Sequence, residues 1–212
     1  MSNNPEKDAI RAEARKREIM DAAFRLFTER SIDKVTMNDV ADAAGIGVAT
    51  VYRHFKTKPD LVLALGARVW REYMAENSQR LPHDGGWPAS RVYEFFLDSF
   101  IDLYLNHREL LRFNQMFNIY VRGEDLSPEQ LASYNAVIAA LAERFHAVYE
   151  QARSDGSLRL ETPEKEMFST TLHLMLAAAT RYAVGLVYDG GVPPEKELAL
   201  LKDMLMERYT VT

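Results

Sequence analysis

Apolar residues recur along most of this chain at intervals of three and four, the spacing that places them on one face of an α-helix. Two clear stripes are Leu131, Tyr134, Ile138, Leu141, Phe145 and Val148, and, nearer the C-terminal end, Leu198, Leu201 and Leu205. We find no convincing run of alternating apolar and polar residues and no Asn-Gly hairpin signal. The pattern therefore predicts an all-α protein.

Prolines and glycines divide this pattern into helices. In Ser127-Pro128-Glu129-Gln130, serine is placed to cap a helix, proline suits its first turn, and Gln130 can reach back to the cap amide. Thr162-Pro163-Glu164 repeats the pattern without the reciprocal residue, and Ser154-Asp155-Gly156-Ser157 marks a helix end. We expect about nine helices, near residues 14–30, 37–44, 48–54, 58–80, 89–105, 107–121, 128–153, 163–188 and 194–209.

The segment from Thr36 to Lys58 is predicted to form two short helices joined by a tight turn. Thr36, with Asp39 three residues later, is a helix cap, and Gly45 can adopt the left-handed conformation that ends this helix. Small residues at Ala41, Ala44 and Ala49 allow the two helices to approach closely, as a helix-turn-helix requires.

The second of these helices carries side chains suited to nucleic acid. Thr50, Tyr52, Arg53 and His54 can donate hydrogen bonds to phosphate oxygens, and Arg53 can also bind guanine. Val48 and Ala49 offer apolar contacts to thymine methyl groups, and Lys56 and Lys58 can neutralise backbone charge. A second interpretation takes Tyr52 and Phe55 as core aromatics and the basic residues as a solvated face. We adopt the core interpretation for Phe55 alone.

The run Thr36-Met-Asn-Asp-Val-Ala-Asp-Ala-Ala-Gly-Ile-Gly-Val-Ala-Thr-Val-Tyr-Arg-His-Phe-Lys-Thr-Lys58 resembles the helix-turn-helix of TetR-family transcriptional repressors. Ile19 to Phe27 is similar to the first helix of that family, and the resemblance in motifs covers about residues 14–65. Two departures are Gly47, where these proteins often have serine, and Pro59, which replaces a common acidic residue.

The resemblance implies a helix-turn-helix DNA-binding domain with an N-terminal arm over residues 1–57, and a larger helical ligand-binding and dimerisation domain over residues 58–212. Carried over by position, the base-proximal residues are Asn38, Val48, Ala49, Tyr52 and Arg53. The phosphate contacts are then Thr36, Thr50, His54 and Lys58. The arm from Lys7 to Arg17 could add nonspecific phosphate contacts or be a merely solvated helix.

The C-terminal two-thirds carries aromatic residues at helical spacing, which suit either a core or a ligand cavity. Because TetR-like proteins bind an inducer among their middle helices, the resemblance implies a small-molecule site. Our ligand-binding candidates are Phe96, Phe100, Tyr104, Phe113, Asn114, Phe117, Tyr134, Phe145, His146 and His173. Glu94, Asp98 and Asp102 share one helix face, which could receive a cationic ligand or, as we favour, face solvent.

The resemblance also implies a homodimer, formed through residues 163–209, that binds a palindromic double-stranded DNA operator. In that mechanism a small, largely apolar inducer releases the repressor from the operator. The sequence is compatible with activation as well as repression, and it identifies neither the ligand nor the operator.

Composition is compatible with a DNA-binding N-terminal part, and it excludes several classes of site. The net charge of −5 divides into +1 for residues 1–60 and −6 for residues 61–212, so the N-terminal part permits a nucleic-acid partner. The absence of cysteine excludes disulfides, iron–sulfur clusters and thiol nucleophiles. No apolar leader or membrane-length apolar run occurs, so we expect a cytoplasmic protein with no membrane partner.

The alternative class is a helical-bundle enzyme, or a ligand-binding module that does not bind DNA. Its one foothold is Glu143-Arg-Phe-His146, which has the Glu-x-x-His spacing of di-iron bundles. Such centres need a second copy of that motif and two further glutamates, and we find no second copy in the sequence. We therefore expect no catalytic residue, metal or cofactor.

Overall fold

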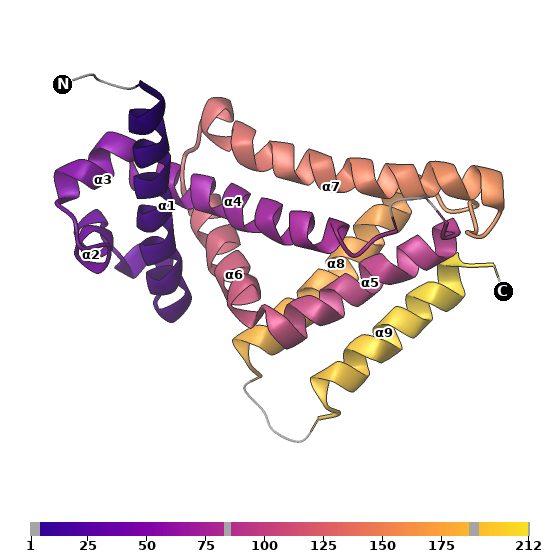
Figure 1. Cartoon of the computed structure of the whole chain (residues 1–212). Coiled ribbons are helices and arrows are strands. Elements are labelled where there is room, and N and C mark those ends of the chain that lie inside the picture. The colour runs from indigo at the N-terminus through magenta and orange to yellow at the C-terminus, as the bar shows by residue number, and fades with distance from the viewer. Residues whose placement is uncertain (1–4, 83–85, 187–190, 212) are drawn as a thin grey trace. The chain divides into compact units, whose positions relative to one another are not determined.

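The computed structural model describes residues 5–82, 86–186 and 191–211, and within these ranges it is all-α, as predicted (Figure 1). The helices are α1 (Pro5–Glu29), η1 (Ile32–Lys34, a 3₁₀ turn), α2 (Met37–Ala43), α3 (Val48–His54), α4 (Lys58–Ser78), α5 (Ala89–Asn106), α6 (Arg108–Gly123), α7 (Pro128–Asp155), α8 (Glu164–Val184) and α9 (Pro194–Tyr209). The β structure of the described ranges is one isolated antiparallel bridge between Leu158 and Thr210. None of the described helices is both long and apolar enough to cross a membrane.

Most predicted helix ends lie within two residues of the observed ends, but two predictions were wrong. α1 begins at Pro5 rather than near residue 14. The prediction missed its first turns because they are charged and exposed and so lack an apolar stripe. α8 ends at Val184 rather than at residue 188, since Gly185 has a φ of +105° and leaves the helical conformation. Residues 187 and 188 lie outside the described ranges.

One of the two Pro-containing helix starts has the predicted cap. The backbone amide of Gln130 donates to Ser127 Oγ (3.3 Å), and the amide of Ser127 donates to Gln130 Oε1 (3.1 Å), which is the reciprocal pair. At α8 the N-cap is Pro163, without a side-chain cap. Thr162 instead is buried, and its hydroxyl accepts a hydrogen bond from Arg208 (3.3 Å).

The chain packs as two units, which we call unit 1 (residues 1–68 and 113–134) and unit 2 (residues 69–112 and 135–212). This division concerns packing alone. The assignment of DNA binding to residues 1–57, and of ligand binding and dimerisation to residues 58–212, stays a prediction.

Unit 1 contains the predicted helix-turn-helix, with α1 packed on α2 and α2 on α3. Ile19 and Phe27 of α1, Val40 of α2 and Val51 of α3 are each at most 1 % exposed. Each such side chain contributes about 1.5–3 kcal/mol by leaving water. Removing one of them would loosen the support that holds α3 in place.

Helices α4 and α6 approach closely within unit 1 at a glycine. A Cβ atom added to Gly66 would lie 2.6 Å from Cε2 of Phe117, which is closer than real Cβ contacts. Phe117 is itself 1 % exposed, so its ring has little freedom to move aside. Glycine is therefore required at position 66 by packing rather than by backbone conformation.

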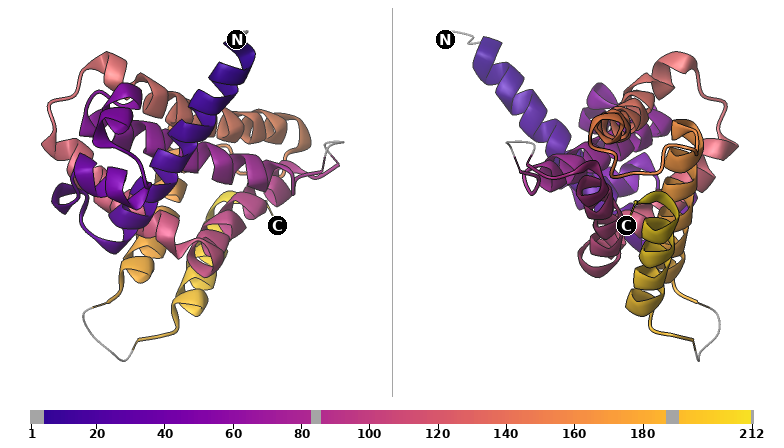
Figure 2. Two further views of the ribbon diagram at one scale, coloured as in Figure 1. Left: turned by 60° about the vertical axis from the view of Figure 1, so that its left-hand side comes forward. Right: turned by 90° about the vertical axis from the view of Figure 1, so that its right-hand side faces the viewer.

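Unit 2 is built on α5, α8 and α9, each of which packs against the other two (Figure 2). Its core includes Tyr93 of α5, Phe145 of α7, Met175 of α8 and Leu205 of α9. The hydroxyl groups of Tyr93 and Thr171 hydrogen-bond to each other at 2.8 Å in this core, which satisfies both buried oxygens. The predicted stripes on α7 and α9 thus supply core residues.

Candidate nucleic-acid interface

Helix α2 begins with the predicted capping box. The amide of Asp39 donates to Thr36 Oγ1 (3.1 Å), and the amide of Thr36 donates to Asp39 Oδ2 (2.7 Å). The Thr36 hydroxyl also donates to this carboxylate, and these bonds from the Thr36 side chain and backbone lower the pKa of Asp39. Thr36 therefore fixes the start of α2, and its contact with phosphate stays a prediction.

The turn between α2 and α3 depends on Gly45, as predicted. Its φ is +66°, and an added Cβ would meet no atom within 4 Å, so only the backbone conformation calls for glycine. The next amide, that of Ile46, donates back to the carbonyl of Ala41 (3.0 Å). The N-cap of α3 is Gly47, which provides no side-chain hydrogen bond, the weakness expected from the glycine there.

Helix α3 has a buried face and an exposed face. Val51 and Phe55 are 0 % and 3 % exposed, which confirms Phe55 as a core residue. Ala49, Tyr52 and Arg53 are exposed, and Tyr52 keeps 49 % of its surface in contact with solvent. Tyr52 therefore presents both its ring and its hydroxyl group, a hydrogen-bond donor, to a partner.

The other predicted DNA contacts lie around that exposed face. Asn38 is exposed, and Val48, Thr50 and His54 are half-buried. Burial, followed by the charges of Arg53, Lys16 and Arg15, lowers the pKa of His54. His54 is consequently neutral near pH 7 and can donate one hydrogen bond without carrying a charge.

Lys58 is held within unit 1. Its ammonium group lies 5.3 Å from the centre of the Tyr120 ring and donates to the carbonyl of Asp33 (3.4 Å). Burial lowers the pKa of Lys58. A phosphate contact by this lysine would require its side chain to leave these partners, and it stays a prediction.

Comparison with known proteins supports the interpretation of this segment as a TetR-type helix-turn-helix. Residues 19–65 match the family described as "Bacterial regulatory proteins, tetR family". An HTH-type transcriptional regulator of Staphylococcus aureus (strain MRSA252) is 26 % identical over 147 residues, which are 69 % of this chain and 72 % of that protein. This part of the chain is the N-terminal region of the TetR family. Its resemblance to that family is thereby confirmed.

A second relative has a higher identity over a shorter stretch. An HTH-type transcriptional regulator of Staphylococcus aureus (strain bovine RF122 / ET3-1) is 47 % identical over 55 residues, 26 % of this chain. The match spans 28 % of the length of that relative.

Solved structures share the fold over nearly the whole TetR-family chain. A protein of Saccharomonospora viridis, described as a transcriptional regulator in complex with choline, has a TM-score of 0.72 and 21 % identity and covers 94 % of this chain and 99 % of its own. The fatty acid degradation regulator FadR of Bacillus halodurans has a TM-score of 0.71 and 14 % identity, with 97 % of each chain covered. At these identities the likeness extends to the fold alone.

The predicted ligand residues of the TetR-family chain do not all lie in one unit. Unit 1 holds Phe113, Asn114, Phe117 and Tyr134. The ring of Phe117 lies 5.8 Å from that of Phe113 and 4.6 Å from that of Tyr134, measured between ring centres. Asn114 is 5 % exposed, so it is a polar group in an apolar setting. Ligand binding by these four residues stays a prediction.

Unit 2 holds the other six candidates, in three settings. Phe145 lies in its core, 5.2 Å from the ring of Phe168, with Phe96 and Phe100 packed against the same core. Tyr104 is buried and lies 6.1 Å from the ring of Tyr182. His146 and His173 are both exposed. The structure thus places the rings in packed clusters and the histidines at the surface, and a ligand role for either group stays a prediction.

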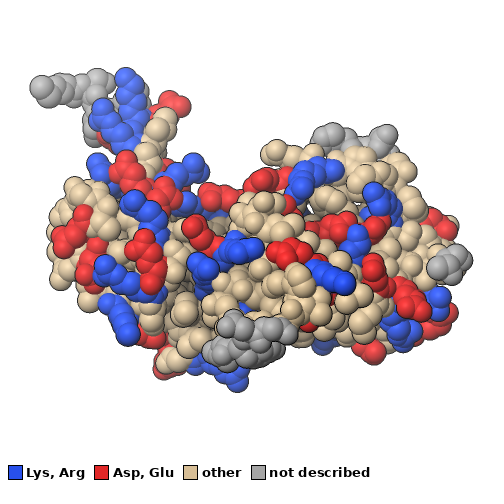
Figure 3. Space-filling view, turned by 90° about the horizontal axis from the view of Figure 1, so that it is seen from below, with Lys and Arg blue, Asp and Glu red and all other residues tan. Residues whose placement is uncertain are grey.

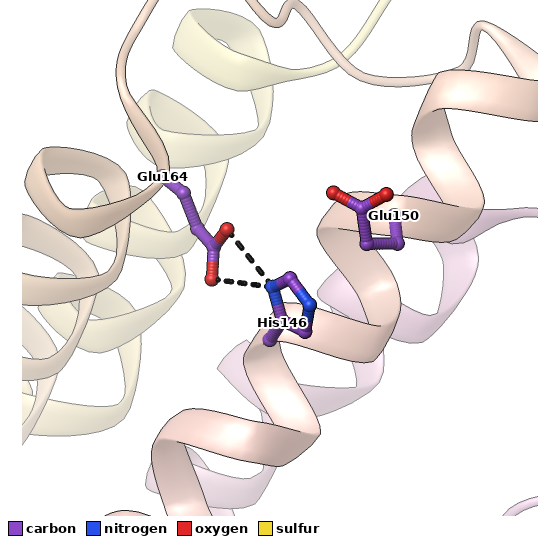
Figure 4. Close-up of side chains that lie close together, drawn as sticks. All are labelled: His146, Glu150 and Glu164. Atoms are coloured by element: carbon purple, nitrogen blue, oxygen red, sulfur yellow. Dashed lines mark hydrogen bonds and ion pairs between the residues drawn. The ribbon is translucent and has the colours of Figure 1, made fainter.

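His146 forms a surface cluster with Glu150 and Glu164 (Figure 4). Its Nδ1 atom lies 3.0 Å and 3.1 Å from the two carboxylate oxygens of Glu164, and this bond raises the pKa of His146. One ligand atom from each of the three residues lies within 4.8 Å of the others, close enough for a divalent ion after small side-chain shifts. Glu150 also pairs with Arg153 (2.8 Å), so the arrangement is explained by ion pairs.

The acidic row of α5, Glu94, Asp98 and Asp102, is neutralised by basic side chains of the same protein. Lys202 of α9 lies 2.9 Å from Glu94 and 2.6 Å from Asp98. Burial acts against the charged form of Lys202, yet its hydrogen bonds to Asp98 and Glu94 raise its pKa. Asp102 lies 3.4 Å from Arg80. These carboxylates are half-buried ion-pair partners, and sequence reasoning missed these pairs because Lys202 and Arg80 come from parts of the chain outside α5.

An exposed apolar surface lies along α8 and α9. On α8, Leu174 is 36 % and Val184 is 45 % exposed, and Ala177 between them is exposed as well. On α9, Leu200 is 51 % and Met204 is 61 % exposed, while Leu198 and Leu205 are buried. Both faces of α9 are thus apolar, a pattern typical of a helix that packs on two sides.

Proposed function

We propose that this TetR-family chain is a cytoplasmic transcriptional repressor that binds a palindromic DNA operator as a homodimer and is released by a small, largely apolar inducer. The observation that carries the proposal is the exposed face of α3. Ala49, Tyr52 and Arg53 face solvent on a helix whose opposite face is fixed by buried Val51 and Phe55. That helix lies within the stretch that matches the family.

The chemistry of this face suits the major groove. An α-helix with its side chains is about 10–12 Å across, so α3 can enter a major groove about 12 Å wide. Val48 and Ala49 at its start present methyl groups that can meet thymine methyls. Tyr52 and Arg53, one turn later, supply hydrogen-bond donors for base edges or phosphates.

A homodimer would use the apolar surface of α8 and α9. Leu174, Val184, Leu200 and Met204 leave apolar area in water that a second copy can cover, and exposed Ala177 allows close approach of two helices. A twofold dimer presents two copies of α3 to half-sites one helical turn apart, about 34–36 Å. The proposed operator is therefore palindromic.

The proposed inducer is largely apolar because the three carboxylates of α5 that could receive a cation are already paired. Glu94 and Asp98 hold Lys202, and Asp102 holds Arg80, so these carboxylates need no cationic ligand. Within unit 2, the aromatic side chains of Phe96, Phe100 and Phe145 supply apolar surface. The neighbours differ in ligand, since one is in complex with choline and another, FadR of Bacillus subtilis, with stearoyl-CoA.

Release would follow from a difference in inducer affinity between two conformations. An inducer that binds more tightly to the form unable to match both half-sites lowers the affinity for DNA by the ratio of its two binding constants. By linkage, operator DNA lowers inducer affinity by the same factor. A compound that binds equally to both forms would not act as an inducer.

The direct test is a fluorescence-anisotropy titration with the DNA immediately upstream of the gene, using a scrambled duplex as control. We expect the upstream duplex to bind roughly 10³-fold or more tightly than the scramble at physiological salt. Binding that is equally weak and steeply salt-dependent for both duplexes would indicate only a nonspecific basic face at this locus. If a genome-wide pull-down then also recovers no preferred fragment, the proposal is wrong.

A further inference from the structure

A groove in unit 1 separates α1 from the end of α3. It has a volume of about 560 Å³, and its polar lining comes from Arg11, Arg15 and Glu18 of α1 and from Arg53 and His54 of α3. Three guanidinium groups thus face one carboxylate. The groove is a concave, basic surface built from two elements of the same unit.

The cations of the groove are only partly neutralised. Arg15 lies 2.7 Å from Glu18, and Arg11 lies 3.9 Å from Asp8, but Arg53 makes no ion pair within the part of the chain that the structure describes. Burial is the main cause of the lowered pKa of His54; the charges of Arg53, Lys16 and Arg15 lower it further, and the charge of Glu13 acts in the opposite direction. An anion entering the groove would therefore meet excess positive charge.

The first half of α1 buries no side chain that would explain its presence. Residues 5–14 are all exposed, and the first buried residue of the helix is Ile19. Figure 2 shows these turns projecting beyond α2 and α3, and Figure 3 shows basic side chains on them, interleaved with acidic ones. Since most helical stability in proteins comes from packing, an extension of this kind suggests a surface used with a partner.

We propose that this groove holds the sugar-phosphate backbone of the DNA duplex bound by α3, with Arg11 and Arg15 of α1 and Arg53 of α3 as the phosphate ligands. The inference rests on the proposed function and adds a second, sequence-independent contact surface to it. α1 then binds the duplex from the side of the recognition helix, and the N-terminal arm is part of the DNA-binding domain.

The shape of the groove favours a strand over an isolated anion. Arg11 and Arg15 lie on the same face of α1, one turn and roughly 6 Å apart along its axis, so they can contact successive points on a strand. Arg53 belongs both to the groove and to the exposed face of α3, so a duplex on that face continues into the groove. A free phosphate ion would use only part of this surface.

The test compares the double variant Arg11→Ala/Arg15→Ala with Arg17→Ala, which removes an exposed arginine from another face of α1. Affinity for the upstream duplex and for its scramble is measured by anisotropy at several salt concentrations, and the folded state is checked by circular dichroism. We expect the double variant to bind both duplexes more weakly by a similar factor, on the order of tenfold. Its salt slope should fall by about 1 for each phosphate ligand removed, while Arg17→Ala stays near the wild type.

The outcomes separate this inference from the proposed function. If the wild type binds DNA and the double variant matches Arg17→Ala in affinity and salt slope, the groove does not hold the backbone and the inference alone is wrong. If the wild type binds neither duplex, both fall. Titration with inorganic phosphate distinguishes a site for the DNA backbone from a site for a free phosphate ion. Saturation of the wild type at low millimolar phosphate, abolished in the double variant, would make the groove a free-anion site and overturn the inference.

Discussion

Single residues determine what α3 presents to a partner. The types and spacing of Tyr52, Arg53 and Phe55 were enough to predict which would be exposed and which buried, and the structure confirms all three. Lys58 was less predictable, because the Tyr120 ring and the Asp33 carbonyl that hold it come from elsewhere in the chain. Local sequence therefore predicts whether a side chain is exposed better than it predicts which groups that side chain contacts.

At this scale, the His146–Glu164 pair gives a pH-dependent prediction. The hydrogen bond and charge of Glu164 raise the pKa of His146 above its ordinary value of 6.5. A raised pKa in the folded state stabilises the fold fully below the unfolded value, and this contribution is lost as the pH rises through the folded value. His146→Ala should therefore lower the Tm at pH 5.5 and leave it unchanged at pH 9.

The matched control is His173→Ala, which removes the other exposed histidine from this part of the chain. Thermal denaturation followed by circular dichroism at both pH values checks the prediction. A loss of Tm in His146→Ala that is equal at pH 5.5 and pH 9 would show that the ion pair contributes nothing and that only the side chain's packing matters.

At the scale of the helices, ends with a local chemical signal were predictable and ends without one were not. The capping residues Thr36 and Ser127 and the glycine Gly45 mark their helix ends in the sequence itself. The start of α1 at Pro5 has no such signal, since its first turns are charged and bury nothing. The close approach of α4 and α6 was also invisible, because it depends on residues about fifty positions apart.

That approach yields a prediction at the same scale. In Gly66→Ala the new methyl group would lie 2.6 Å from a ring carbon of Phe117, so α4 and α6 must separate. We expect the free energy of unfolding to fall by about 1–3 kcal/mol, the usual cost of overpacking a core. Urea denaturation measures it.

A second variant separates the steric clash from a general effect on α4. Phe117→Leu removes the ring, so Gly66→Ala should cost less in that background than in the wild type. Equal costs in the two backgrounds would mean that Gly66 and Phe117 do not interact and that the description of this contact is wrong.

At the scale of the whole molecule, the sequence predicted the all-α fold and its family. It could not predict how the side chains of the C-terminal two-thirds divide among core, ion pairs and surface. The acidic row of α5 illustrates this, because Lys202 lies about a hundred residues from Glu94 and Asp98 in the chain yet neutralises both. Such pairings depend on tertiary packing, which no local pattern encodes.

The apolar surface of α8 and α9 gives the prediction at this scale. Leu200 and Met204 are 51 % and 61 % exposed, so replacing both with glutamate should leave the protomer folded. The charges would be buried without partners in the proposed dimer, so by light scattering we expect this variant to be a monomer and the wild type to be a dimer. Lys196→Glu/Asp203→Lys, which alters exposed charges of α9, is the control. A dimeric Leu200→Glu/Met204→Glu protein would place the interface elsewhere.

Whether α3 reads DNA is decided by the affinity of Tyr52→Ala for the DNA upstream of the gene, measured beside the wild type and Tyr52→Phe. Because Tyr52 is 49 % exposed, its truncation should leave the melting temperature nearly unchanged. We predict that Tyr52→Ala binds this duplex at least about tenfold more weakly than the wild type, and that Tyr52→Phe falls between them. If Tyr52→Ala binds as tightly as the wild type, α3 is not the surface that reads DNA.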